Sequence, residues 1–288
     1  MPLWAGAPPD PFKPTLYSKE TVTVDPKEQI GGKAVIGIDS VSVPTLTLYR
    51  PKTENSGAAV LVFPGGGYWN LAIDLEGTEV CDWLTANGIT CLIVKYRTPG
   101  FDNVDASRTG PYPKSIIALE DSQRAIALTR YHAKEWGIDP HKIGVIGFSA
   151  GGHLVAATST NDRVYKPTDA IDQTSVRPDF GIALYPGHIS DNDNSLALKS
   201  GLPVDARTPP QFILQSGGDP VDSVDNSLAW YIALKKANVK AELHIFPEGG
   251  HAFGLRHTDK AITDWPKLAL SWLEAIGMIG HPTKGKRN

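Results

Sequence analysis

Apolar residues recur along the chain in two alternating patterns. Short continuous apolar runs, typical of strands covered on both faces, alternate with longer stretches whose apolar residues have helical spacing. Predicted strands cover residues 21–24, 45–49, 58–63, 89–96, 142–148, 180–185, 211–215 and 241–246. Predicted helices cover residues 76–86, 115–136, 150–159, 226–237 and 262–276. The first two strands alternate apolar and polar residues, which favours an antiparallel edge.

This alternation predicts an α/β fold with a mostly parallel central sheet and helices on both faces. No internal repeat or low-complexity linker divides the sequence, so we expect a single domain over residues 21–280. The proline-rich residues 1–20 predict an extended arm on the surface. Residues 99–113 predict a polar loop, and the irregular residues 187–209 predict a loop insertion above the carboxyl edge of the sheet.

Composition narrows the classes of partner. The 28 lysines and arginines against 31 aspartates and glutamates give a net charge of −3, which provides no reason to expect nucleic acid or an anionic membrane as partner. No apolar run approaches the roughly 18 residues that a membrane span needs. The sequence contains no H-E-x-x-H motif and no cysteine and histidine set. We therefore expect no metal and no cofactor.

The sequence contains two cysteines, Cys81 in a predicted helix and Cys91 in a predicted strand. Two cysteines cannot build a disulfide framework or a four-ligand zinc site, so we expect two buried free thiols. Met1 leads into proline-rich and glycine-rich residues without the basic start and apolar stretch of an export signal. We expect a cytoplasmic protein if Met1 is native, and a secreted or periplasmic protein if an export signal has been removed.

Residues 147–151 form the pentapeptide Gly-Phe-Ser-Ala-Gly, with Ser149 at its centre. A predicted strand precedes it and a predicted helix follows, which is the context that a nucleophile elbow requires. Such a turn places the serine hydroxyl at a helix N-terminus, where the helix dipole favours developing negative charge. The alternative is a chance occurrence of the pattern in a helix-capping turn.

Residues 64–68, Pro-Gly-Gly-Gly-Tyr, follow the strand at 58–63. Ester hydrolysis passes through an oxyanion that needs backbone N–H donors, and glycines let the backbone approach it closely. The alternatives are a flexible turn or a phosphate-binding loop, but neither a G-x-G-x-x-G nor a G-x-x-x-x-G-K spacing is present.

Asp219 and His251 each follow a predicted strand through a glycine pair. Both therefore lie at the carboxyl edge of the sheet, where open parallel sheets place their sites. The chain order Ser149, Asp219, His251 is that of α/β-hydrolase triads, in which the histidine is the base and the aspartate orients it. Asp222 is the alternative acid. We expect the acidic clusters around Asp219 and residues 191–194 to be solvated loops, because neither matches a calcium loop.

Four segments together resemble the α/β-hydrolases of the bacterial acetylxylan-esterase and feruloyl-esterase-like branch. They are the sequences FPGGGY, GFSAGGHL, DPVDSVDNSL and ELHIFPEGGHAFGL, which begin at residues 63, 147, 219 and 242. The resemblance implies Ser149, Asp219 and His251 as the triad. It implies the amides of Gly66, Gly67 and Ala150 as oxyanion donors. Relatives often carry histidine where this sequence has Pro64, which affects the geometry of the loop rather than the mechanism.

The hypothesis is a serine carboxylesterase that removes small acyl groups, foremost acetyl, from plant polysaccharide or oligosaccharide such as xylan. Aromatic and imidazole rings that follow strand ends are candidates to line the substrate cleft: Tyr68, Trp69, Tyr185 and His188. The alternatives are a general short-chain or feruloyl esterase, a serine peptidase, and a non-catalytic binding protein. A peptidase of this class would need an extra domain, and a binding protein usually lacks one residue of the triad.

Overall fold

The computed structural model describes residues 1–9, 19–98, 113–192 and 195–280. A seven-stranded sheet forms its centre, with strand order β10-β9-β8-β7-β4-β6-β3. All neighbouring strands are parallel except the edge pair β3 and β6. The strands are β3 (Thr45–Tyr49), β4 (Ala59–Phe63), β6 (Thr90–Lys95), β7 (Ile143–Phe148), β8 (Phe180–Leu184), β9 (Gln211–Ser216) and β10 (Ala241–Phe246). The predicted mostly parallel sheet with an antiparallel edge is confirmed.

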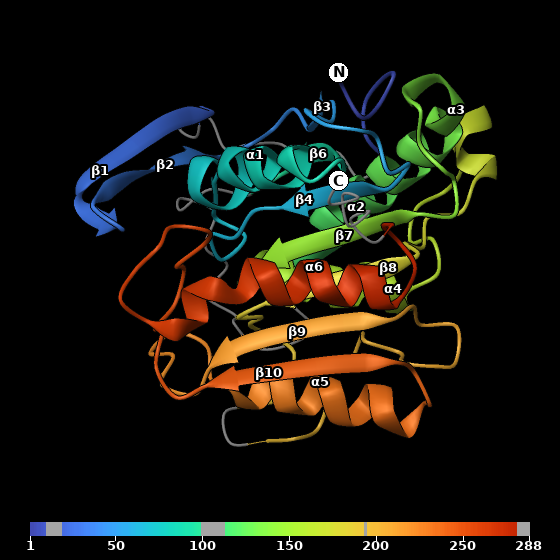
Figure 1. Ribbon diagram of the computed structural model, residues 1–288. Helices are drawn as coiled ribbons and strands as arrows, with labels where there is room; N and C mark the ends of the chain where they lie inside the picture. Colours follow the sequence, from blue (N-terminus) through green and yellow to red (C-terminus); the bar gives the residue numbers. More distant parts are fainter. Residues whose placement is uncertain (10–18, 99–112, 193–194, 281–288) are drawn as a thin grey trace, which may run out of the picture.

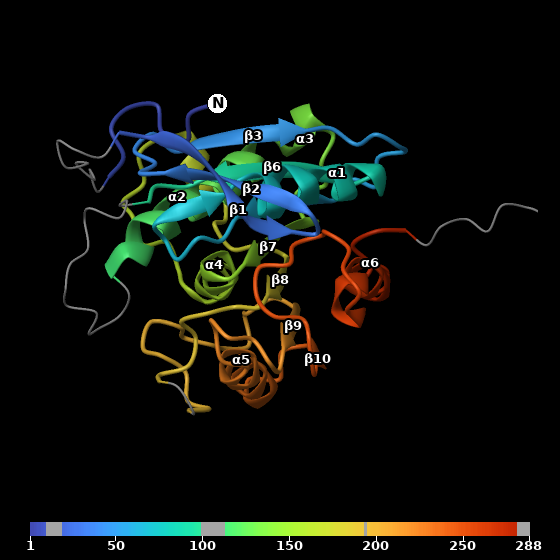
Figure 2. The same ribbon diagram turned by 90° about the vertical axis from the view of Figure 1, so that its left-hand side faces the viewer.

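Helices cover both faces of this sheet, as Figure 2 shows. One face packs against α2 (Pro113–Tyr131), α4 (Ala150–Thr160) and α5 (Asp225–Lys236), and the other packs against α1 (Glu79–Ala86) and α6 (Trp265–Ala275). The strand β4 explains why the sequence pattern is a continuous apolar run. Its residues Leu61 and Phe63 join one hydrophobic cluster while Val60 and Val62 join the other, and all are fully buried.

The predicted helix at 76–86 begins instead as the π-helical turn η1 (Asp74–Thr78) and continues as α1. The predicted helix at 115–136 divides into α2 and α3 (Ala133–Trp136). Two further one-turn 3₁₀ helices are η3 (Ala170–Gln173) and η4 (Ala261–Asp264). The carboxyl ends of the central parallel strands point to one edge of the sheet (Figure 1), so the loops that follow β4, β7, β9 and β10 meet there.

A second, three-stranded antiparallel sheet lies beside the first. It has the order β1-β2-β5 and consists of β1 (Thr21–Ile30), β2 (Lys33–Asp39) and β5 (Asn70–Ala72). Strand β1 was expected at an edge of the main sheet, but it pairs with β2 instead. The short strand β5 follows the glycine loop directly, so this small sheet holds the end of that loop in place.

The first residues of the chain differ from the surface arm expected over residues 1–20. Leu3 and Trp4 are buried in the main hydrophobic cluster, and Trp4 Nε1 donates a 2.8 Å hydrogen bond to Asp121 Oδ1. Residues 10–18 of the predicted arm lie outside the described residues, as do residues 99–112 of the predicted polar loop. The predicted insertion at 187–209 is irregular where it is described, with an isolated bridge between Ser190 and Leu198.

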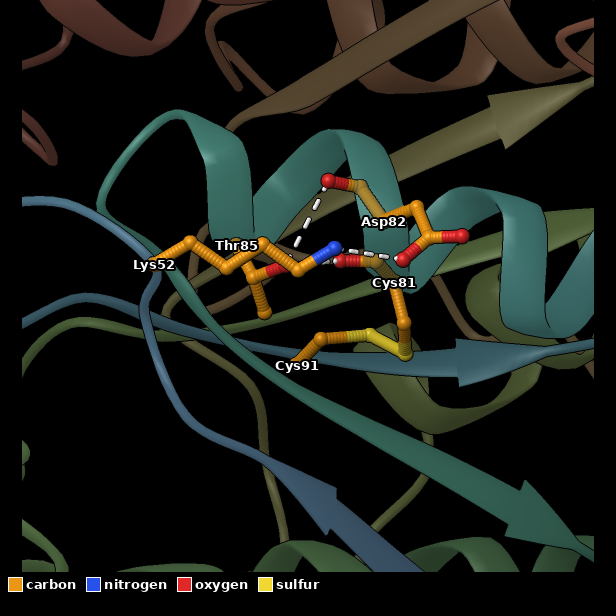
Figure 3. The surroundings of a disulfide bond; sticks show 5 residues. All are labelled: Lys52, Cys81, Asp82, Thr85 and Cys91. Carbon is orange, nitrogen blue, oxygen red and sulfur yellow. Dashed lines mark hydrogen bonds and ion pairs between the residues drawn. A yellow bond between two sulfur atoms is a disulfide. The ribbon is translucent and has the colours of Figure 1, made fainter.

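The expectation of two free thiols is wrong, because Cys81 and Cys91 form a disulfide (Figure 3). Cys81 lies on α1 and Cys91 on β6, and their Cα atoms are 5.2 Å apart, within the usual range for a disulfide. Both belong to the hydrophobic cluster between α1 and the sheet. The bond therefore attaches the helix that follows the glycine loop to the sheet. The helix and strand were predicted correctly, but their sequence patterns do not show that the two side chains face each other.

We expect the Cys81→Ala/Cys91→Ala double variant to have a lower free energy of unfolding, by about 2–3 kcal/mol, because a cross-link between residues 10 apart restricts the unfolded chain. Urea unfolding without reductant, compared with the wild type, measures the change. Reduction of the wild type with dithiothreitol provides the matched control. Equal midpoints for the oxidised, reduced and double-variant proteins would contradict this expectation.

Candidate active site

Ser149 lies at a sharp turn between β7 and α4. Its backbone has φ of 52° and ψ of −118°, a region that non-glycine residues rarely adopt and that costs on the order of 1–3 kcal/mol. The neighbouring glycines are required by close packing. A Cβ on Gly147 would lie 2.0 Å from the carbonyl oxygen of Gly151, and one on Gly151 would lie 2.0 Å from that of Phe63. The turn presents the Ser149 hydroxyl at the first turn of α4.

Hydrogen bonds join Ser149 to His251 and His251 to Asp219. The distances are 3.0 Å from Ser149 Oγ to His251 Nε2, and 2.7 Å from His251 Nδ1 to Asp219 Oδ2. A carboxylate only accepts hydrogen bonds, so Nδ1 carries the proton and Nε2 is free to accept from the serine hydroxyl. Asp219 also accepts the backbone N–H groups of Val221 and Asp222 at its other oxygen, which fixes the carboxylate.

The parallel pairing of β9 and β10 explains why Asp219 and His251 meet. Ser216 pairs with Phe246 at the end of both strands, so the two following loops leave the sheet side by side. The Asp219 side chain is fully buried and the His251 side chain is 11% exposed. The histidine is therefore shielded on the carboxylate side while it stays within reach of the serine.

Burial by itself would lower the pKa of His251. The hydrogen bond and the negative charge of Asp219 raise this pKa, and the charges of Asp222 and Glu76 raise it further. The pKa of His251 is therefore above its ordinary value of 6.5. The site therefore stabilises a positively charged imidazole, which is the form that a histidine base takes after it accepts a proton.

The structure separates the positions of the two candidate acids. Asp219 bonds to Nδ1 of His251, whereas Asp222 Oδ2 lies on the opposite side of the ring, 3.7 Å from Nε2 and 3.4 Å from Ser149 Oγ. Only the position of Asp219 allows a carboxylate to orient the imidazole while Nε2 faces the serine. Asp222 stands instead beside the serine hydroxyl.

The glycine loop after β4 passes directly against Ser149. A Cβ on Gly65 would lie 3.0 Å from that of Ser149, so these two segments are in contact. Gly66 and Gly67 have φ of 127° and 62°, and a Cβ on Gly66 would lie 1.9 Å from Asn70 Oδ1. Within the described part of the chain, the amides of Gly66, Gly67 and Ala150 donate no hydrogen bond outside helices and strands. Their role as oxyanion donors stays a prediction.

A buried network that the sequence analysis missed holds this loop and the histidine loop together. Glu76 is 2% exposed and accepts hydrogen bonds from the Gly65 N–H at 2.7 Å and from the Tyr185 hydroxyl at 2.8 Å. The same hydroxyl accepts the Gly254 N–H at 3.1 Å. Burial raises the pKa of Glu76, and the bonds from Tyr185 and Gly65 oppose that rise. The signal in the sequence was an acid at an apolar position of a predicted helix.

Arg256 provides a second link between the same parts of the molecule. Its guanidinium pairs with Asp74 at 2.9 Å and with Glu79 at 3.0 Å, and donates to the carbonyl of Lys33 at 2.8 Å. The loop that carries His251 is thereby attached to η1, to the start of α1 and to the small sheet. These contacts help to hold the loop that carries the base in place.

The four proposed cleft residues occupy two kinds of position. Tyr68 and Tyr185 are fully buried, and their hydroxyls bond to His153 Nδ1 at 2.7 Å and to Glu76 respectively. These two tyrosines therefore support neighbouring segments through His153 and Glu76 and do not line a cleft. Trp69 and His188 are half-buried, and His188 borders a polar pocket beside Asp222. Burial lowers the pKa of His188 to about 4, so its ring is neutral near pH 7.

The described residues contain no group of three or more histidine, cysteine, aspartate or glutamate side chains able to hold a metal ion. No helix among the same residues is both long and apolar enough to span a bilayer.

The fold and the hydrogen-bonded serine, histidine and aspartate define an α/β-hydrolase. Two family models match, BD-FAE over residues 46–184 and the prolyl oligopeptidase family over residues 118–277. The acetyl ester-xyloside bifunctional hydrolase of Caldicellulosiruptor lactoaceticus is 32% identical in sequence, with a TM-score of 0.73 and 97% of each chain covered. The chain belongs to the acetylxylan-esterase and feruloyl-esterase-like branch of the α/β-hydrolases.

Two curated relatives are longer than this chain. The acetylxylan esterase of Xylanibacter ruminicola is 30% identical over 279 residues, which cover 86% of this chain and 52% of that protein. Endo-1,4-beta-xylanase B of Butyrivibrio fibrisolvens is 28% identical, and the match covers 77% of this chain and 36% of the relative. An esterase of Thermogutta terrifontis, at 21% identity and a TM-score of 0.68, shares the fold.

Proposed function

We propose that this protein is a serine carboxylesterase that removes acetyl groups from acetylated xylan or its oligosaccharides. The observation that carries the proposal is the hydrogen-bonded sequence Ser149, His251, Asp219 beside a glycine loop with available amides. The activities after which the acetylxylan esterase of Xylanibacter ruminicola and the acetyl ester-xyloside hydrolase are named support the choice of substrate.

The mechanism follows from the position of each atom. His251 Nε2 takes the proton of Ser149 as Oγ attacks the acetyl carbonyl, and Asp219 stabilises the resulting imidazolium. The amides of Gly66, Gly67 and Ala150 donate to the oxyanion of the tetrahedral intermediate. His251 then gives the proton to the sugar oxygen as the C–O bond breaks, which leaves an acetyl-serine. Water, deprotonated by His251, releases acetate by the reverse sequence.

Acetate release from acetylated xylan, with Ser149→Ala as the blank, tests the proposal. Release by the wild type alone supports both the triad and the carbohydrate substrate. Hydrolysis of p-nitrophenyl acetate without release from xylan or its acetylated oligosaccharides would keep the mechanism and move the substrate to other short-chain or feruloyl esters. Failure on every ester would overturn the proposal.

Amide hydrolysis is the second candidate, because the prolyl oligopeptidase family model matches residues 118–277. The same triad can transfer an acyl group from an amide. A set of chromogenic peptide amides distinguishes the two candidates. Turnover of a peptide amide at a kcat/KM above that of acetylated xylo-oligosaccharides would favour the peptidase.

We expect activity to rise with pH through a pKa above the ordinary histidine value of about 6.5. His251 acts as a base only when neutral, and its raised pKa means that the neutral form appears at higher pH. Initial rates of p-nitrophenyl acetate hydrolysis from about pH 5 to about pH 9 measure this. Asp222→Asn removes one of the charges that raise the pKa, so its profile should shift to lower pH. A flat wild-type profile would contradict the role of His251.

A further inference from the structure

A polar pocket lies at the carboxyl edge of the sheet, and one of its lining residues, Asp222, is a neighbour of Ser149. Its volume is about 110 Å³, and it is open to solvent on one side. Its walls come from the loop after β8, with Ser190 and Lys199, and from the loop before α5, with Asp222 and Ser223. Asp222 therefore belongs both to this pocket and to the surroundings of the serine hydroxyl.

The position of Asp222 relative to the alcohol half of an ester can be deduced from the mechanism. To receive a proton, the leaving oxygen must lie about 3 Å from His251 Nε2. Asp222 Oδ2 is 3.7 Å from the same nitrogen and 3.4 Å from Ser149 Oγ. The carboxylate thus stands next to the place of the leaving oxygen, where a hydroxyl on the adjacent carbon of the alcohol can reach it.

Several contacts hold Asp222 at this place. Its backbone N–H donates to Asp219 Oδ1 at 3.0 Å, and its carbonyl accepts from Gln215 Nε2 at 2.7 Å. Gly187 leaves the space for its side chain, because a Cβ there would lie 2.3 Å from Asp222 Oδ1. The backbone of Asp222 is thus fixed to the triad aspartate, and its carboxylate packs against Gly187.

The pocket walls combine hydrogen-bond acceptors and donors. Asp191 and Asp222 supply carboxylates, Asn192 an amide and Lys199 an ammonium group, whereas Val221 is the apolar residue of the lining. Such a surface suits an alcohol with several hydroxyl groups, and it offers little to a flat aromatic alcohol. The pocket is linked to the nucleophile through Asp222, whose Oδ2 lies 3.4 Å from Ser149 Oγ.

We propose that this pocket binds the sugar half of the substrate and that Asp222 accepts a hydrogen bond from a free hydroxyl on the carbon beside the esterified one. The inference rests on the proposed esterase function and specifies its substrate as a partly acetylated sugar. A fully acetylated sugar lacks that hydroxyl, so the site selects against it. Asp222 is in this view a specificity-determining residue.

The test compares kcat/KM for a monoacetylated methyl xyloside, the fully acetylated methyl xyloside, monoacetylated glycerol and p-nitrophenyl acetate, all at a pH where His251 is neutral. We expect the wild type to prefer the monoacetylated xyloside to the fully acetylated one by about tenfold or more, as a hydrogen bond to a charged group allows. The Asp222→Asn and Asp222→Ala variants should lose that preference. Dividing each value by that for p-nitrophenyl acetate removes effects on His251 that all substrates share.

Asp225→Asn is the matched control, because Asp225 is a carboxylate three residues further along at the start of α5 and outside the pocket lining. Its substrate preference should equal that of the wild type. An equal preference in the wild type for mono- and fully acetylated xylosides, or a preference retained in both Asp222 variants, would overturn the inference. If kcat/KM for monoacetylated glycerol equals that for the monoacetylated xyloside, the enzyme requires only a hydroxyl on the adjacent carbon. That result would overturn the proposal that the pocket binds a sugar. If the wild type hydrolyses none of these esters, the proposed function is overturned instead.

Discussion

Replacement of Ser149 with alanine lowers kcat for p-nitrophenyl acetate on the order of 10⁴- to 10⁶-fold, because the triad acts as a unit and only the oxyanion donors and substrate binding remain. The turn itself should survive. Alanine carries the same Cβ as serine at φ of 52°, so the backbone strain does not increase. Initial rates measure the loss, and circular dichroism with the melting temperature shows whether the fold is kept.

A fluorophosphonate probe provides an independent readout of the same residue. The probe should label the wild type and not Ser149→Ala, because it reacts with a serine whose hydroxyl is activated by a base. Near-normal turnover in a folded Ser149→Ala variant, or labelling of that variant, would exclude Ser149 as the nucleophile.

Asp219→Asn should lower kcat on the order of 10⁴-fold, as the equivalent change does in serine proteases. An amide in place of the carboxylate can present its NH₂ group to Nδ1. The imidazole then carries its proton on Nε2 and cannot accept the serine proton. Steady-state kinetics at a fixed pH measure the effect, and an unchanged KM would show that substrate binding is intact.

Asp222→Asn is the comparison that distinguishes the two acids. Asp222 faces Nε2 and Ser149 Oγ rather than Nδ1, so its loss leaves the tautomer of His251 unchanged. The fall in kcat for p-nitrophenyl acetate should be much smaller than for Asp219→Asn. A larger fall in the Asp222 variant would reverse the assignment of the acid.

Features set by neighbouring residues in the chain were predictable from the sequence. The turn at Ser149 depends on small residues two positions away on either side, and the buried strands show as continuous apolar runs. Asp219 and His251 could be placed because each follows a strand of a parallel sheet, which sends its loops to a common edge. The choice between Asp219 and Asp222 needed the orientation of the imidazole, which the sequence does not encode locally.

Features that depend on how distant elements pack were not predictable. The disulfide requires α1 to lie over β6 so that Cys81 faces Cys91, and the helical and strand patterns are the same whether or not this occurs. Tyr185 follows a strand end, as a cleft residue would, but its ring packs under His251 and its hydroxyl bonds to Glu76. The hydrogen bonds of the Tyr185 hydroxyl depend on the packing of three segments that are far apart in the sequence, those of Glu76, Tyr185 and Gly254.

The network of Glu76 and Tyr185 joins the glycine loop to the loop that carries His251. The glycine loop, which carries the proposed oxyanion donors, and the loop of the base His251 are therefore both held in place by hydrogen bonds that involve Glu76. Substitutions in the two loops should not have additive effects on the activation free energy, since damage to either loop is transmitted through the same carboxylate. A double-mutant cycle between Gly254 and Gly65 would report this coupling. Directed evolution of one loop for a new acyl group would then have to accommodate the other loop at the same time.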